Sequence, residues 1–432
     1  MFILDVVRAR KGDCLILHYG SEDDPHLMLI DGGPKSVYSP HLRPRLEQIR
    51  KERGLSGKDP LLVDLLMVSH VDDDHIQGIL DLTKELITSE MEHKSPLIQV
   101  LGFWHNSFEN VIDHTPDELT ASFTKKFGAA SMEGDPPDDL TVEPDGEDEE
   151  TVRSTLKVLA SIKQGAQLRH DAERLGFPLN PEFDGKLVLA SGKNSVDMEN
   201  GLEFTVVGPM SPELKKLHAK HQAWLKDLAE EGMTAEDALA AYVDKSVPNL
   251  SSIVVLVKVA GKSMLLTGDA RGDKILAGLE LVKLVKKGGK LRVNILKVPH
   301  HGSSNNLDQD FFDRVIADHY VFSGNGEHGN PERESLEMLL AARGDENYQV
   351  HITYPIAEID AGRKADWQKE QTKEKKKKEK NPDKEVRPNW SPAKHSIASL
   401  LKDNPKFAKK IRIVPEGKPH LIDALAELKK RP

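Results

Sequence analysis

The sequence predicts a layered α/β protein, and two observations lead to this prediction. Short apolar runs typical of strands alternate with segments whose apolar residues recur at helical spacing. Histidines and aspartates follow directly after several of these apolar runs, where layered α/β folds build their active sites. The chain has 432 residues, enough for one large domain with insertions or for two domains.

The N-terminal part of the chain shows the clearest alternation. Strands are expected at Met1–Val7, Cys14–Tyr19, Leu27–Ile30, Leu61–Ser69 and Leu97–Trp104. Helices are expected at His41–Arg53 and Ile76–Met91. The sequence Asp31-Gly32-Gly33-Pro34 is a strong turn signal after the third strand.

The alternation then breaks in a segment of about residues 106–180, which we interpret as a mostly helical insertion. Within it, residues 134–150 hold nine acidic side chains and no basic one. Such a stretch buries too little apolar surface to order itself, so we expect a flexible acidic loop. Two interpretations remain open: a solvated spacer, or a polyanion mimic that a regulatory protein or a protease displaces from a basic substrate groove. A helix is expected at Thr151–Leu175.

Strands and helices resume after the insertion. The expected strands are Lys186–Ala190, Leu202–Val207, Ser252–Val259, Lys262–Thr267, Arg292–Val298, Tyr320–Ser323 and Val350–Thr353. The expected helices are Ser211–Val243, Asp273–Lys287 and Pro331–Arg343. The predicted main domain therefore covers residues 1–355.

Residues 356–432 are predicted to form a charged linker and a C-terminal extension. Between positions 363 and 387, eleven Lys or Arg residues stand against six acidic ones without apolar periodicity. This stretch is either a solvated linker or a highly charged helix. Ile411–Val414 and Leu421–Leu428 recover enough apolar pattern to pack back on the core.

Composition restricts the class of protein. Hydrophobic residues make up 38% of the chain and charged residues 30%, and the net charge of −10 argues against simple coating of nucleic acid. Cys14 is the only cysteine, which excludes a disulfide framework and a thiolate zinc cage. No apolar stretch approaches the ~20 residues of a membrane span, and no cationic leader is present. We therefore expect a cytoplasmic protein without membrane contact.

The most informative stretch follows the predicted strand that ends at Ser69. His70, Asp72, Asp74 and His75 lie within six positions of one another. Imidazoles and carboxylates packed this closely at a strand end would be costly to bury unless a cation lay among them. The stretch therefore predicts a site for two divalent metal ions.

Three further segments provide partners for such a site. Asp269 ends the apolar sequence Leu265-Leu266-Thr267-Gly268, and His105 follows Phe103-Trp104. The sequence Val298-Pro299-His300-His301-Gly302-Ser303-Ser304 places two histidines at the end of another strand. In each case the carboxyl end of a strand delivers a candidate ligand.

Together these motifs resemble the metallo-β-lactamase superfamily, whose usual signature is His-x-His-x-Asp-His followed by a late Asp and a late His. Here Asp72 replaces the second histidine, a variant most similar to the soluble hydrolase domain of bacterial DNA-uptake channel proteins. The resemblance covers residues 1–105 and about 185–345. It implies an αββα sandwich, but no DNA uptake, because the membrane channel is absent.

The resemblance also implies roles for individual residues. The first metal would take His70, Asp72 and His105, the second Asp74, His75 and His301, and Asp269 would bridge the two metals. Asp74 also belongs to the catalytic machinery, His300 would face the substrate or support a ligand, and His328 would contact substrate or protonate the leaving group. An aspartate at position 72 makes the cage harder and shifts its preference from Zn²⁺ toward Mn²⁺ or Mg²⁺.

Each candidate also has a structural alternative. Asp74 and the histidines beside it could cap a helix, Asp72 could bond a neighbour, Asp269 could be a turn aspartate, and His328 could lie on a surface turn. Ligation and a structural role are equally open for His105.

The leading functional hypothesis is a metal-dependent phosphodiesterase, most simply a DNA nuclease serving as a regulated effector in bacterial defence. Lys283, Lys286, Lys287, Lys290 and Arg292, together with the 363–387 run, are candidate phosphate contacts. One alternative is a hydrolase of a small ester, lactone or lactam, which a deep narrow pocket would favour. The other is a non-catalytic scaffold that binds a partner through the insertion.

Overall fold

The computed structural model describes residues 1–106, 164–191, 195–198, 201–211 and 252–428. The described helices include the short π-helix η1 (Tyr38–Leu42), α1 (Arg43–Glu52), α2 (Asp73–Met91), α9 (Gly272–Leu281), α10 (Gln309–Arg314), α11 (Arg333–Arg343), α12 (Ile356–Lys380), α13 (Pro392–His395), α14 (Ile397–Asp403) and α15 (Pro405–Ala408). Short 3₁₀ turns are η3 (Pro181–Phe183), η5 (Pro299–Gly302), η6 (Ser304–Asn306) and η7 (Glu327–Gly329).

The protein is a mixed α/β structure with two large sheets. The six-stranded sheet has the order β16 (Leu421–Asp423), β1 (Phe2–Val6), β2 (Leu15–Gly20), β3 (Pro25–Ile30), β5 (Leu65–Val68) and β7 (Phe103–His105). The eight-stranded sheet has the order β15 (Ile411–Arg412), β14 (Gln349–Ile352), β13 (Val315–Phe322), β12 (Leu291–Lys297), β11 (Lys262–Leu266), β10 (Val254–Val259), β9 (Leu202–Gly208) and β8 (Ser195–Met198). A small sheet pairs β4 (Leu61–Val63) with β6 (Ile98–Val100).

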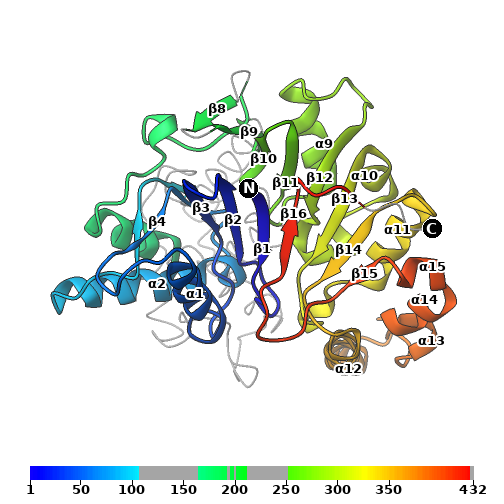
Figure 1. The fold of residues 1–432 in the computed structure, drawn as a ribbon. Helices are drawn as coiled ribbons and strands as arrows, with labels where there is room; N and C mark the ends of the chain where they lie inside the picture. Colours follow the sequence, from blue (N-terminus) through cyan, green and yellow to red (C-terminus); the bar gives the residue numbers. More distant parts are fainter. Residues whose placement is uncertain (107–163, 192–194, 199–200, 212–251, 429–432) are drawn as a thin grey trace, which may run out of the picture.

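The two large sheets face each other, and helices cover their outer faces (Figure 1). Apolar side chains of both sheets form one core between them, for example Leu17 and Met28 against Val255 and Met264. A second core lies between the six-stranded sheet and α1 and α2, and a third between the eight-stranded sheet and α9, α10, α11 and α14. Alternate residues along the strands thus bury both faces of each sheet.

Several elements differ from the sequence prediction. The single strands expected at Leu61–Ser69 and Leu97–Trp104 are each two strands, and the first of each pair lies in the small sheet. Lys186–Ala190 does not form a strand and makes only an isolated bridge at Ala190. β8 and α10 were not expected. The strands expected at Ser252–Val259 and Lys262–Thr267 are present as β10 and β11, which pair as a hairpin with its turn at Ala260 and Gly261.

Parts of the predicted insertion lie outside the described residues. These parts are the acidic run 134–150, most of the helix expected at Thr151–Leu175, and the helix expected at Ser211–Val243. Residues 164–174 are helical, as predicted.

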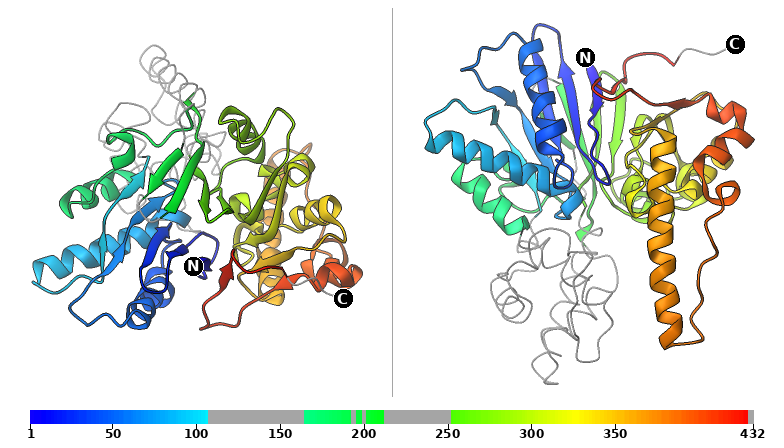
Figure 2. Two further views of the ribbon diagram at one scale, coloured as in Figure 1. Left: turned by 45° about the horizontal axis from the view of Figure 1, so that its top comes forward. Right: turned by 90° about the horizontal axis from the view of Figure 1, so that it is seen from below.

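The segment after residue 355 joins both sheets. β15 pairs with β14 in the eight-stranded sheet, and β16 pairs with β1 in the six-stranded sheet. Of the two possibilities for the charged run, the structure selects the helix: α12 is 25 residues long, and its C-terminal half extends away from the sheets (Figure 2, right). Among the helices that the structure describes, none has the length and apolarity that crossing a membrane requires.

Candidate metal centre

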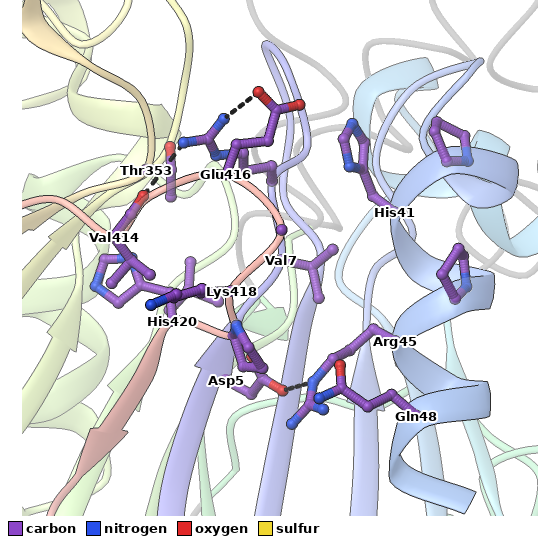
Figure 3. A pocket seen from close by; sticks show the side chains of 16 residues that line it. Asp5, Val7, His41, Arg45, Gln48, Thr353, Val414, Glu416, Lys418 and His420 are labelled. Carbon is purple, nitrogen blue, oxygen red and sulfur yellow. Dashed lines mark hydrogen bonds and ion pairs between the residues drawn. The ribbon is translucent and has the colours of Figure 1, made fainter. Parts of the chain in front are cut away.

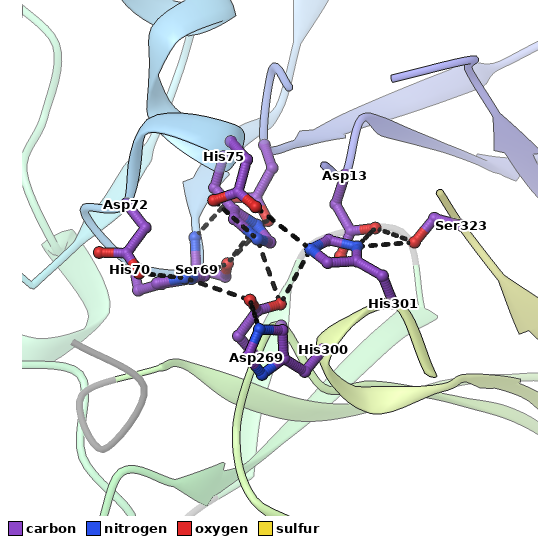
Figure 4. A network of polar contacts seen from close by, with 12 residues as sticks. Asp13, Ser69, His70, Asp72, His75, Asp269, His300, His301 and Ser323 are labelled. Atoms are coloured by element: carbon purple, nitrogen blue, oxygen red, sulfur yellow. Dashed lines mark hydrogen bonds and ion pairs between the residues drawn. The ribbon is translucent and has the colours of Figure 1, made fainter. Parts of the chain in front are cut away.

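The candidate site lies where strand ends from both large sheets meet (Figure 4). β5 leads into Ser69, His70 and the first turn of α2, which carries Asp74 and His75. β11 leads to Asp269, and β12 leads to His300 and His301. The prediction that these distant segments converge agrees with the structure.

Local backbone geometry explains how the segments approach one another so closely. A Cβ at Gly12 would lie 1.9 Å from the carbonyl oxygen of Asp74, so only glycine lets the β1–β2 turn rest on the first turn of α2. His300 and His301 both have left-handed φ angles, 47° and 53°. Such conformations are strained for residues other than glycine and are typical of functional sites.

Three buried imidazoles point their Nε2 atoms toward one carboxylate. The Asp269 Oδ1 atom lies 3.1 Å from His75 Nε2 and 3.4 Å from His301 Nε2. Its Oδ2 atom lies 3.8 Å from His70 Nε2. None of these Nε2 atoms has a hydrogen-bond partner within the described part of the chain. Buried polar atoms normally have one, so their convergence indicates room for a cation.

The opposite nitrogen of each ring is held. His75 Nδ1 lies 2.8 Å from the Asp31 carboxylate, and His70 Nδ1 lies 3.0 Å from the Ser69 hydroxyl. His301 Nδ1 lies 2.9 Å from the Ser323 hydroxyl and 3.2 Å from an Asp13 oxygen. Partners at Nδ1 orient the rings so that Nε2 is available, as is usual for metal-binding histidines.

Two overlapping groups of side chains have the spacing that a metal ion requires: Asp13, His75, Asp269 and His301 form one, and His70, Asp74 and His75 form the other. Asp74 joins the first as well, since its carboxylate lies 3.6 Å from His301 Nε2. Both groups contain His75. They agree with the expectation that buried His and Asp side chains at this site could hold metal ions.

Asp13 is better placed to orient a histidine of this cluster than to bind a metal ion itself. One of its oxygens lies 2.5 Å from the buried Lys297 ammonium, and the other accepts from Ser323 at 2.6 Å. With both oxygens occupied, Asp13 is suited to hold His301 in place. The sequence analysis missed Asp13, Asp31, Ser69, Lys297 and Ser323.

The remaining predicted residues lie at different distances from the centre. His300 Nε2 is 3.5 Å from Asp269 Oδ2, and its side chain is 27% exposed. Asp72 is the N-cap residue of α2, lies 3.7 Å from His70 Nε2, and belongs to neither group. His328 is exposed on η7.

His105 is also outside both groups. It is buried at the end of β7, opposite Val68, with its ring stacked on Phe103 at a centroid distance of 5.6 Å. Burial lowers the pKa of His105 to about 4, although a backbone contact with Gly165 opposes this effect. The structure therefore does not place His105 among the residues gathered around Asp269, and a neutral imidazole is compatible with both roles expected for this residue.

Charge within the cluster is shared between imidazoles and carboxylates. Burial lowers the pKa of His75 and of His301, but Asp269 together with Asp31 or Asp13 outweighs burial and holds both pKa values well above normal. Burial and the neighbouring His75 lower the pKa of His70 to about 3. Protons on His75 and His301 therefore balance the negative charge of the carboxylates around them. A bound cation would balance the same charge, so metal binding would release these protons.

A cavity of about 160 Å³ lies elsewhere, between β1, α1 and the loop 414–420 (Figure 3). The Asp5–Arg45 ion pair, at 2.6 Å, forms part of its wall. None of the cluster residues lines it. This cavity therefore does not supply the deep pocket at the metal centre that a small-substrate hydrolase would need.

Comparisons with known proteins establish no family for the chain. No family model matches it. Microtubule-associated protein 1A of Rattus norvegicus is 41% identical over 75 residues, which are 16% of this chain and 3% of that protein. The same protein of Mus musculus is 41% identical over 68 residues, which are 15% of this chain and 2% of that protein. The chain thus spans only a small fraction of these relatives.

Proposed function

We propose that the protein is a metal-dependent hydrolase of the metallo-β-lactamase type that cleaves phosphodiesters, with DNA as the substrate. The observation that carries this proposal is the arrangement around Asp269: three buried Nε2 atoms, which have no hydrogen-bond partner among the described residues, face its two oxygens. The two facing sheets with outer helices, and ligands at the strand ends, are what the resemblance leads one to expect.

The donor set fits a pair of divalent cations. His70 would hold one cation, Asp74, His75 and His301 the other, and Asp269 both. When bound, such a pair supplies a hydroxide nucleophile by lowering the pKa of water, and charge stabilisation for a phosphate. Asp31, Ser69 and Asp13 keep the rings oriented, and the partly exposed His300 can donate a hydrogen bond to a substrate oxygen.

Metal content and cleavage test this proposal directly. Purified protein would be incubated with plasmid DNA and with DNA and RNA oligonucleotides in Mg²⁺, Mn²⁺ or Zn²⁺, and bound metal would be measured by mass spectrometry. We expect stoichiometric metal and activity with Mn²⁺ at least equal to that with Zn²⁺. Strict zinc dependence would contradict the predicted preference, and hydrolysis of small esters without nucleic-acid cleavage would favour the alternative substrate class.

Substitution of the bridging carboxylate provides the matched control. Asp269→Asn should reduce activity and metal content by more than the about 10–100-fold typical of losing an outer-shell partner. Asp273→Asn changes an exposed aspartate four residues later, paired only with Arg271 at 2.9 Å, and should leave both unchanged. Equal effects of the two substitutions would refute the assigned role of Asp269.

A further inference from the structure

The lysine-rich helix α12 begins beside the candidate metal centre. α12 starts four residues after β14. β14 runs parallel to β13, and β13 runs parallel to β12, so all three strands end at the edge that carries the site. Its first turns pack on the loop 324–330: a Cβ at Gly326 would lie 2.2 Å from the Ile359 carbonyl oxygen, and Arg363 donates to the Gly329 carbonyl at 3.0 Å.

The same loop borders the proposed metal cluster. The Asn330 amide donates to the His300 carbonyl oxygen at 3.4 Å, and the Glu332 backbone amide donates to the Gly302 carbonyl at 3.1 Å. Because the loop contacts both His300 and α12, it fixes the start of the helix at the rim of the site.

The far half of α12 carries a concentrated positive charge. Lys375–Lys378 are four consecutive lysines, so the charge surrounds the helix instead of forming one stripe. Lys376 and Lys378 are exposed and make no hydrogen bond or ion pair within the described part of the chain. Two acidic side chains that precede the lysines on α12 have other partners: Glu370 pairs with Lys373 at 2.6 Å and Glu374 with Arg387 at 2.7 Å.

We propose that the C-terminal half of α12 is an arm that holds the phosphate backbone of a long nucleic acid whose cut position lies at the metal centre. This inference rests on the proposed function and adds a substrate class, extended strands in preference to short ones. Lys375 lies twelve residues after Arg363, which corresponds to about 18 Å along the helix axis. At about 3.4 Å per nucleotide along a strand, the lysines reach phosphates about five positions from the cut.

Another lysine cluster provides a matched control. Lys283, Lys286, Lys287 and Lys290 are exposed, equal in number, and precede β12, whereas His300 and His301 follow its other end. The seven residues of β12 therefore hold this cluster about 23 Å from the metal centre. The structure thus places these lysines, which the sequence analysis offered as candidate phosphate contacts, at the edge of the sheet opposite the candidate metal centre.

The test measures binding in EDTA, so that cleavage does not enter. Fluorescence anisotropy would follow 24-nucleotide and 4-nucleotide DNA and RNA, single-stranded and, for the long form, duplex, at several salt concentrations. We expect replacement of Lys375–Lys378 by Gln to weaken binding of the long forms roughly tenfold at 0.1 M salt and to reduce the salt slope, since fewer counterions are released. Binding of the 4-nucleotide form should not change, and the control variant with Gln at 283, 286, 287 and 290 should behave like the wild type.

Other results of the binding measurement refute the arm. Equal losses in the two quadruple variants would show a general charge effect, and equal losses for short and long strands would show that the lysines do not act at a distance. Displacement of DNA by anionic vesicles or an acidic peptide at lower concentrations than by unlabelled DNA would assign the arm to that partner instead. Normal binding through the arm without cleavage in any metal would contradict the proposed function and leave the arm intact.

Discussion

At the scale of single residues, the centre depends on side chains that hold its histidines. Asp13 and Lys297 are both buried, with side chains 1% exposed; Asp13 lies in the turn between β1 and β2, and Lys297 ends β12 of the other large sheet. A buried ion pair contributes little net stability, but removal of one partner leaves an uncompensated charge. The pair is therefore better explained by the orientation of His301 than by stability.

We predict that Lys297→Met alone lowers the free energy of unfolding by about 3–5 kcal/mol, because it leaves the Asp13 carboxylate buried without its partner. The double variant Asp13→Leu/Lys297→Met should regain most of that stability. Its metal affinity should nevertheless stay about 10–100-fold below wild type, since His301 Nδ1 has lost its carboxylate. Urea denaturation and calorimetric metal titration measure the two quantities.

The control for this prediction is another buried pair. Asp5 and Arg45, with side chains 1% and 9% exposed, form an ion pair at 2.6 Å that does not touch the cluster. Asp5→Leu/Arg45→Met should leave metal affinity unchanged. If both double variants bound metal equally poorly, a general softening of the fold, and not the position of His301, would explain the loss.

The sequence indicated the histidines and aspartates of the cluster better than the side chains that hold them. His70, Asp74, His75, Asp269 and His301 were found because they follow apolar strands. Asp31 follows a strand in the same way and could have been found by the same rule. Lys297 gave a signal too, since a lysine inside an apolar run implies a buried anion. Asp13 could not be found, because its partners lie about 300 positions away in sequence and only the fold brings them together.

At the scale of elements, α2 depends on one close backbone contact. A Cβ at Gly78 would lie 2.0 Å from the Gly32 carbonyl oxygen, so the helix meets the turn after β3 backbone to backbone. The Gly32 backbone amide donates to the His75 carbonyl at 2.7 Å, which ties this contact to a proposed ligand.

We predict that Gly78→Ala destabilises the protein by about 3 kcal/mol, because the methyl group forces α2 away from β3. It should also weaken metal binding, since Asp74 and His75 lie on the displaced turn. Lys84→Ala, at an exposed position of the same helix, should change stability by no more than about 0.5 kcal/mol. Unchanged stability of Gly78→Ala in urea denaturation would show that the contact relaxes easily.

The division of one expected strand into β4 and β5 could not be predicted from the apolar pattern of the sequence. The apolar run from Leu61 to Val68 gives no sign that the chain leaves the small sheet and enters the large one. Asp64 marks the change: its carboxylate accepts from the Leu27 backbone amide at 2.8 Å and lies 2.9 Å from His26 Nδ1. Both partners belong to β3, so the break is determined by a neighbouring strand and not by local propensity.

At the scale of the whole molecule, the C-terminal segment connects the two sheets. β15 extends one sheet, β16 extends the other, and the loop between them carries His420. The His420 Nε2 atom lies 2.9 Å from His351 Nδ1, and His351 Nε2 lies 3.0 Å from His319 Nδ1. The sequence predicted that this segment packs back, but the connection through three histidines requires the register of β13 and β14.

This chain of histidines predicts how stability depends on pH. Burial, then Asp5 and Arg8 with opposite signs, set the pKa of His420 at about 4, below the ordinary value of 6.5. Burial and the neighbouring imidazoles also lower the pKa of His351. Between pH 6.5 and about 4 the unfolded chain binds protons that the folded one refuses, so stability is full above pH 6.5 and falls as the pH is lowered.

The test compares wild type with His420→Gln, which keeps a polar side chain but cannot titrate in this range. The free energy of unfolding of the wild type should fall by up to about 3 kcal/mol more than that of the variant between pH 7 and pH 4, since one pKa unit corresponds to about 1.4 kcal/mol. Both proteins would be measured in EDTA, which removes bound metal. Titration of the candidate metal centre then contributes equally to the free energy of unfolding of both proteins and cancels in the difference. His93 is exposed beyond the end of α2, and His93→Gln serves as the control that should follow the wild-type curve. Parallel curves for wild type and His420→Gln would show that the connection between the sheets tolerates a charged His420, and its burial would then not explain any loss of stability in acid.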